Sequence, residues 1–275
     1  MEGRLSPKTD GRFQSFPKDS WRQEFPRASQ SGLSRIEWIY DFDTAELNPL
    51  TTDVGIAQMK ALNKDTGIEV RSLCADGFVE EHLINTDGSI NNSNVEKLLW
   101  LMDRSRLAGI QYIVLPFVDF SSLKTSAQKE GAATLFSKLS SYVQEGVLEL
   151  HIESDFNPGV FGDFMKRVTS NGIKVNYDTG NSASLGYDPV EEFRAYGSKI
   201  GSVHIKDRIR GGGTVPLGQG DTQIPLVLKL LHQVGYDRYF TLQAARQKED
   251  NEVATVSGYV SHLRRLLNEV TIDAK

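Results

Sequence analysis

The segment VLELHIE (147–153) is followed along the chain by IKVNYD (173–178), SVHIKD (202–207) and YFTLQ (239–243). Each of these strand-like segments carries, at or near its end, a side chain that can bind a divalent metal: Glu153, Asp178, His204 and Gln243. Helix-length stretches separate the segments. Apolar strands that alternate with amphipathic helices become parallel neighbours, and their C-terminal ends gather on one face. The pattern therefore predicts a (β/α) barrel with a metal site on that face, which indicates an enzyme.

Outward from these segments, three further strands are expected upstream. They are RIEWIYD (35–41), GIEVRSLCA (67–75) and GIQYIVLPF (109–117), and the other strands span 147–153, 173–178, 200–207 and 239–244. Helices are expected over about 20–31, 53–64, 91–107, 127–144, 159–170, 190–196, 226–234 and 251–267. The 275 residues suit one barrel, which typically needs about 250 residues, so we expect a single α/β domain over 1–275 with a (β/α)8 TIM-barrel fold.

A closed barrel of this kind has eight strands, and seven are visible in the sequence. Only MEGRL (1–5) precedes the first expected helix. The first strand is therefore expected to be very short or missing. Because an open barrel exposes strand edges, we expect a homo-oligomer or a protein of marginal stability.

Composition narrows the class of protein. A net charge of −5 and a pI near 5.6 argue against a general nucleic-acid surface. No apolar run is long enough for a membrane span, and MEGRLSPKTDGRFQSFPKD (1–19) lacks the apolar core of a signal peptide. The single cysteine, Cys74, excludes an intrachain disulfide and fits a reducing cytoplasm, so a cytoplasmic protein is expected.

The four strand-end side chains form a plausible ligand set for Mn²⁺, Mg²⁺, Co²⁺ or Zn²⁺. A lone Asp or Glu at a strand end more often caps a helix or accepts a loop hydrogen bond. Four such side chains at successive strand ends are much harder to explain in that way. His151 lies two residues before Glu153 on the same side of its strand, and we interpret it as a core histidine one layer deeper.

A basic, glycine-rich stretch follows His204. In KDRIRGGGTVPLGQGD (206–221), three cations precede three glycines, and a further cation, Arg246, follows Gln243. Glycine lets a backbone approach an anion closely, and arginine binds phosphate or carboxylate through two parallel hydrogen bonds. A mobile surface loop with solvated charges is the alternative interpretation.

The order Glu153, YDTGN (177–181), VHIKD (203–207) and PLGQGD (216–221), with a ligand on the last strand, resembles the sugar phosphate isomerase/epimerase superfamily. Its members are xylose isomerase-like TIM barrels of carbohydrate metabolism. The resemblance covers about residues 3–267, and GRLSP (3–7) is similar to the loop after the first strand of such proteins. The two central blocks are fairly specific for the superfamily and weak for any one substrate.

The resemblance implies a metal-dependent isomerase or epimerase that acts on a ketose or a ketose phosphate. The metal, held by Glu153, Asp178, His204 and the residue at 243, would polarise the carbonyl and stabilise an enediolate. In epimerases of this group, two glutamates on opposite faces of the reacting carbon remove and return its proton. Glu153 matches the first glutamate, and Gln243 replaces the second.

An amide can ligate a metal but cannot shuttle a proton, so the substitution at Gln243 bears on the reaction. One-base isomerisation by Glu153 and dehydratase chemistry both stay open. Epimerisation would need another carboxylate, such as Asp155 or Asp207.

The resemblance also implies residues that bind the substrate. Asn181 stands where some ketose epimerases have a histidine, and Arg210 matches an arginine that contacts substrate oxygens. Lys206 and Arg208 are candidates for binding a phosphate or carboxylate tail, and Arg246 would add a cation on the same face.

Three other functions are alternatives to an isomerase or epimerase. A lyase that dehydrates a keto-polyol is favoured by Gln243. A degenerate barrel that binds a sugar without turnover is favoured by Gln243 and by the missing first strand. An endonuclease acting at abasic DNA would need a three-metal cluster and a basic groove, which five histidines and a negative net charge do not support.

Overall fold

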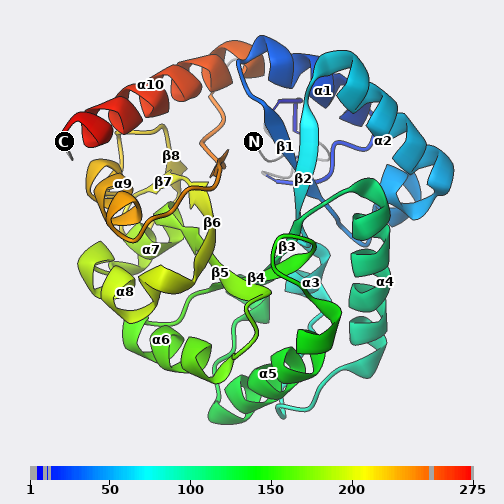
Figure 1. Ribbon diagram of the computed structural model, residues 1–275, viewed down its shortest axis with the longest axis vertical. Coiled ribbons are helices and arrows are strands. Elements are labelled where there is room, and N and C mark those ends of the chain that lie inside the picture. Colours follow the sequence, from blue (N-terminus) through cyan, green and yellow to red (C-terminus); the bar gives the residue numbers. More distant parts are fainter. Residues whose placement is uncertain (1–4, 9–10, 12–13, 248–250, 274–275) are drawn as a thin grey trace.

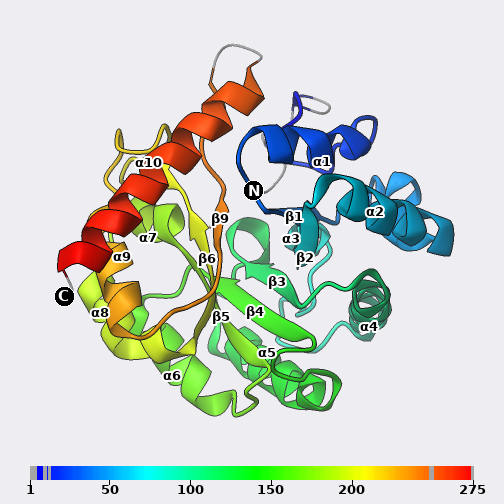
Figure 2. The same cartoon turned by 45° about the horizontal axis from the view of Figure 1, so that its top comes forward.

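A seven-stranded parallel sheet curls into a nearly closed barrel in the computed structural model, which describes residues 5–8, 11, 14–247 and 251–273 (Figure 1). The strand order is β1-β2-β3-β4-β5-β6-β9, and the helices surround the strands (Figure 2). This confirms the predicted TIM-barrel fold. None of the described helices has the length and apolar character needed to cross a membrane.

The barrel strands are β1 (Arg35–Ile39), β2 (Glu69–Cys74), β3 (Tyr112–Phe117), β4 (Glu149–Ser154), β5 (Ile173–Asp178), β6 (Ile200–Ile205) and β9 (Phe240–Leu242). A short antiparallel pair is formed by β7 (Asp207–Arg208) and β8 (Thr214–Val215). The helices are α1 (Trp21–Gln30), α2 (Asp53–Thr66), α3 (Gly77–Glu80), α4 (Asn92–Ala108), α5 (Ser126–Leu139), α6 (Pro158–Arg167), α7 (Thr179–Leu185), α8 (Pro189–Tyr196), α9 (Ile224–Gln233) and α10 (Glu252–Asp273). Short 3-10 helices span Ala45–Leu47, Pro49–Thr51, Asp119–Ser121, Ser140–Tyr142 and Gly197–Lys199.

All seven expected strands are present. Most are shorter than the expected apolar runs, but β5 has the expected bounds and β4 extends to Ser154. The helix expected over 127–144 ends earlier, at Leu139, because the chain tightens into a 3-10 turn at Ser140–Tyr142. Helix α7 was not expected. It begins directly after β5, where the Asp178 carboxylate accepts hydrogen bonds from the backbone N–H groups of Gly180 and Asn181 and so caps the helix.

The sheet is open between β1 and β9, the two strands at the ends of the strand order. No strand occurs in the described part of the segment before α1, as expected for a missing first strand; residues 1–4 of MEGRL lie outside the described residues. Side chains connect the two edges instead. The Arg35 guanidinium of β1 stacks 3.5 Å from the ring centroid of Tyr239, which precedes β9. Past the other end of β9, Arg246 Nη1 donates to the Ser6 carbonyl at 2.6 Å. The predicted oligomer stays a prediction.

A buried glutamate holds the N-terminal segment at this opening. Glu24 of α1 is 2% exposed and accepts a hydrogen bond from the Ser6 hydroxyl. Burial raises the pKa of Glu24 to about 7, although Ser6, Arg27 and Arg246 act in the opposite direction. The carboxyl is therefore more easily protonated in the folded chain than in the unfolded one.

This pKa predicts a pH-dependent stability. The contribution of Glu24 is fully present below its ordinary pKa of 4.5 and is lost as the pH rises through about 7. The loss is on the order of 3 kcal/mol in the free energy of unfolding. Urea unfolding between pH 4.5 and 8 should show this decline in the wild type and a flatter profile in Glu24→Gln. Parallel profiles would contradict the assignment.

Candidate active site

The C-terminal ends of the barrel strands surround a cleft of about 1100 Å³. Its walls include side chains from the ends of β2, β4, β6 and β9 and from the loops that follow them. Most of the lining residues are polar or charged, among them Gln14, Asp41, Asp76, Glu80, Asp119, Lys124, Glu153, Asn181, Lys206, Arg208 and Gln243. The cleft lies where a (β/α) barrel normally places its chemistry.

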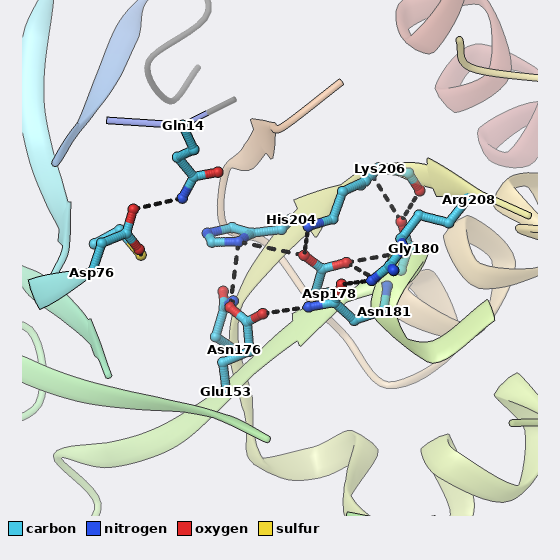
Figure 3. Close-up of polar contacts among 12 residues, drawn as sticks. Gln14, Asp76, Glu153, Asn176, Asp178, Gly180, Asn181, His204, Lys206 and Arg208 are labelled. Carbon is cyan, nitrogen blue, oxygen red and sulfur yellow. Dashed lines mark hydrogen bonds and ion pairs between the residues drawn. The ribbon is translucent and has the colours of Figure 1, made fainter. Parts of the chain in front are cut away.

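Three of the four predicted metal ligands converge at this end of the barrel (Figure 3). Glu153 on β4, Asp178 at the end of β5 and His204 on β6 are all buried. Each offers a ligand atom, and these atoms lie within 4.8 Å of one another. His204 Nδ1 is 3.6 Å from Glu153 Oε2 and 3.9 Å from Asp178 Oδ2. Two carboxylates and an imidazole at this separation fit a divalent metal such as Mn²⁺ or Zn²⁺.

Asp178 combines two functions that the sequence presented as alternatives. Its Oδ1 atom caps helix α7, through the N–H groups of Gly180 at 2.9 Å and Asn181 at 2.8 Å. Its Oδ2 atom lies 2.9 Å from Lys206 Nζ and faces His204. The cap fixes the carboxylate so that the second oxygen remains directed at the candidate metal position.

Two amide groups orient the Glu153 carboxylate. Asn181 Nδ2 donates to Oε1 at 2.7 Å, and Asn176 Nδ2 donates to Oε2 at 2.9 Å. Asn181 also accepts a hydrogen bond from Arg208 Nη1 at 2.8 Å, so it joins Glu153 to the basic side of the cleft. Asn176 was not among the residues predicted from the sequence. Its place two residues before Asp178, on the same side of β5, was the signal for it.

His151 lies one layer deeper in the barrel, as predicted. It is fully buried and stacks on the Tyr112 ring at a centroid distance of 4.3 Å. Its ring nitrogens contact Ser202 Oγ at 2.7 Å and Glu149 Oε2 at 2.8 Å. Both ring nitrogens thus have partners in the core, which supports its interpretation as a core histidine.

Glu37 was also not predicted. It is a fully buried carboxylate on β1, and its Oε1 atom lies 2.7 Å from His204 Nε2. Burial alone would raise the pKa of Glu37, but the interactions with His204 and the Ser72 hydroxyl outweigh it, so the pKa lies below the ordinary value. A glutamate inside the apolar strand RIEWI was the available signal, because such a side chain is rarely buried without a partner.

Gln243 and two of the predicted substrate-binding cations line the cleft, and the cations already have partners. Gln243 is 4% exposed, just past β9. Lys206 pairs with Asp178. Arg208 donates from Nε and Nη2 to the Gly212 carbonyl at 3.1 Å and 2.8 Å, and so pins the glycine-rich loop.

The other predicted cations lie elsewhere. The exposed Arg210 stacks its guanidinium against Gly186, where a β-carbon would lie 2.7 Å from Nε. Arg246 binds the Ser6 carbonyl. Neither side chain is among the residues that line the cleft.

The two alternative carboxylates also lie away from the cleft lining. Asp207 is fully buried and accepts hydrogen bonds from the backbone N–H groups of Gly218, Gly220 and Thr222, so its carboxylate organises the loop. Asp155 is partly exposed just beyond β4, and its carbonyl accepts from the Tyr187 hydroxyl. Neither is placed as a second acid or base in the cleft.

An acidic wall faces the cationic side of the cleft. Asp41 follows β1 and accepts the Phe16 backbone N–H at 2.8 Å, and Asp76 follows β2 and accepts the Gln14 amide at 2.7 Å. In Figure 3, Asp76 and Gln14 lie across from Asp178 and Lys206. Among the described residues, five acidic and three basic side chains line the cleft.

Comparisons with known proteins agree with the fold. A family model described as xylose isomerase-like TIM barrel matches residues 25–266. Comparison with curated proteins finds no matching relative.

Solved structures of similar fold include L-ribulose 3-epimerase, with 18% identity and a TM-score of 0.76 over 99% of this chain and 95% of that one. D-allulose 3-epimerase from Methylomonas sp. in complex with D-allulose has 16% identity and a TM-score of 0.71 over 91% of this chain and 92% of that one. A xylose isomerase-like TIM barrel protein from Mycobacterium smegmatis in complex with magnesium has 18% identity and a TM-score of 0.69 over 98% of this chain and 94% of that one.

Proposed function

We propose, since the chain belongs to the xylose isomerase-like TIM-barrel family, that it is a divalent-metal-dependent isomerase or epimerase of a ketose. The observation that carries the proposal is the convergence of Glu153, Asp178 and His204 beside a polar cleft of about 1100 Å³. Two of the structurally similar proteins are named as ketose epimerases, and a third contains magnesium.

The roles of the residues follow from their chemistry. Glu153, Asp178 and His204 would hold the metal, with the Gln243 amide oxygen as a fourth candidate; when bound, the metal polarises the substrate carbonyl and stabilises an enediolate. Glu153 takes the proton from the carbon beside that carbonyl, and the Asn176 and Asn181 amides keep its carboxylate in place.

Gln243 affects the step in which the proton returns to the substrate. An amide cannot donate this proton as an acid of suitable pKa, so Glu153 returns it on the same face of the substrate. One-base isomerisation is therefore the favoured reaction. Epimerisation at the same carbon requires a second acid on the opposite face of the substrate. The candidates for this acid are the carboxylates of the acidic wall, Asp41 and Asp76, which line the cleft.

The charges of the cleft favour a ketose without a phosphate group. Lys206 pairs with Asp178, and Arg208 is engaged by Asn181 and the Gly212 carbonyl. A phosphate would have to compete with these partners and approach a lining with more acidic than basic side chains. Sugar hydroxyls, in contrast, can donate to the carboxylates. The same charge balance argues against a nucleic-acid substrate.

A substrate screen tests the reaction and this preference together. With Mn²⁺ in D₂O, we expect ketopentoses or ketohexoses to gain solvent deuterium at the reacting carbon. The corresponding phosphates should react with a kcat/KM at least about tenfold lower, a difference of about 1.4 kcal/mol. Mass spectrometry and NMR of the products measure both quantities. Absence of exchange in every ketose would contradict the isomerase, and faster reaction of a phosphate would contradict the preference.

The lyase is the second candidate, and Gln243 is the observation that favours it. If the enediolate expels a β-hydroxyl, Glu153 would pass the proton that it removed to the leaving oxygen, so that water leaves and a single acid–base residue is sufficient. The dehydrated product absorbs in the ultraviolet, whereas an isomerised ketose does not. A rise in absorbance without a ketose or aldose product would assign the lyase.

A further inference from the structure

We propose that Glu37 is a positioning residue for the candidate metal ligand His204, an inference that rests on the metal site of the proposed function. The Glu37 carboxylate, whose Oε1 atom lies 2.7 Å from His204 Nε2, would keep the ring proton on Nε2 and so leave the Nδ1 lone pair directed toward the metal position. No role was expected for Glu37 from the sequence motifs.

The geometry assigns the two ring nitrogens to different partners. Glu37 Oε1 lies 2.7 Å from His204 Nε2, and both side chains are fully buried. On the other side of the ring, Nδ1 faces the carboxylates of Glu153 at 3.6 Å and Asp178 at 3.9 Å. The ring therefore lies between one carboxylate beneath the site and two carboxylates within it.

Metal binding requires that the two ring nitrogens have different functions. A histidine ligand offers the lone pair of one nitrogen, so the proton of the neutral ring must be on the other nitrogen. A buried carboxylate hydrogen-bonded to that second nitrogen selects this tautomer, fixes the ring plane and makes the ligand more basic. Glu37 is at hydrogen-bonding distance from Nε2, and it has no ligand atom in the Glu153, Asp178 and His204 group.

The position of Glu37 in the barrel gives this contact a second consequence. Glu37 is on β1, at one end of the open sheet, whereas His204 is on β6, beside the β9 strand that forms the other end. No backbone ladder joins β1 to β9. The contact therefore crosses the barrel interior between two strands that are not neighbours in the sheet, and the ligand orientation depends on the edge strand β1.

The first measurement concerns protons and requires no metal. Long-range ¹H–¹⁵N NMR of metal-free wild-type protein should show a proton on His204 Nε2, assigned by its absence in His204→Gln. The signal should lie downfield and exchange slowly, because the proton is buried and bonded to a carboxylate. It should move upfield in Glu37→Gln. A wild-type His204 without a proton on Nε2 would overturn the proposal, and this holds even if Glu37→Gln fails to fold.

The second measurement concerns metal affinity. Competition with a chromophoric chelator should give a Kd for Zn²⁺ or Mn²⁺ that is about 10- to 100-fold weaker in Glu37→Gln than in the wild type. Glu24→Gln is the matched control, because Glu24 is likewise a buried glutamate but belongs to α1 and contacts Ser6. Its metal affinity should equal that of the wild type.

The two measurements separate this inference from the proposed function. If folded Glu37→Gln binds metal as tightly as the wild type, Glu37 is not a positioning residue, although the metal site stands. If the wild type binds no divalent metal, the proposed function fails. The NMR result would still show which ring nitrogen of His204 carries the proton beside Glu37.

Discussion

Glu153→Gln is expected to lower kcat/KM by a factor of about 10³ or more. A positioned general base typically contributes a factor of about 10² to 10⁴, and an amide cannot replace it. The substitution also removes a negative charge from the candidate metal site, so metal analysis should find less bound metal than in the wild type.

The environment of Glu153 adds a stability effect to the catalytic one. Both carboxylate oxygens accept amide hydrogen bonds, from Asn181 and from Asn176. The new amide nitrogen would face one of these N–H donors and leave a buried polar group without a partner, which costs about 1–3 kcal/mol. Urea unfolding measures this cost separately from the kinetic effect.

Glu130→Gln is the control for this substitution, because Glu130 is exposed on α5 and pairs with Arg167 across the surface. It makes the same chemical change outside the site and should retain wild-type kinetics and metal content. If Glu153→Gln retained more than about a tenth of the wild-type kcat/KM, Glu153 could not be the proton-transfer group.

The sequence was sufficient to predict the barrel because the signals for its strands and helices are local and repeated along the chain. Apolar strands alternate with capped helices, and each strand of the sheet coincides with such an apolar run. Helix α7 was missed because its cap is Asp178, for which the strand pattern favours a place in the metal site. A helix as short as α7 has too few residues to show a clear helical spacing of apolar side chains.

Site residues at strand ends could be placed from the sequence, whereas site residues on loops were placed less well. The convergence of Glu153, Asp178 and His204 follows from parallel topology. Arg210 and Arg246 lie outside the cleft lining because the path of a loop, and the carbonyl or glycine that a cation meets there, cannot be read from spacing. The Glu37 contact is equally invisible in the sequence, since it joins β1 and β6, which are far apart in the strand order.

Gln243→Glu is expected to tighten divalent-metal binding by about tenfold or more and to introduce or increase epimerisation. Metal affinity rises with the number of charged ligands, and position 243 lines the same cleft as Glu153. A carboxylate there also supplies the second proton-transfer group that an amide cannot provide. Chelator competition measures the affinity, and NMR of the sugar products in D₂O distinguishes inversion at the reacting carbon from one-face isomerisation.

The same substitution should destabilise the metal-free protein, because Gln243 is 4% exposed and the new charge would join the buried carboxylates of Glu153 and Asp178. We therefore expect a lower Tm without metal and a larger rise in Tm when Mn²⁺ is added than in the wild type. Gln243→Leu separates charge from loss of the amide: it should weaken metal binding without producing epimerisation. If Gln243→Glu changed neither the Kd nor the metal-dependent rise in Tm, residue 243 would lie outside the metal's coordination sphere. Glu153, Asp178 and His204 would then be its protein ligands without a fourth from β9.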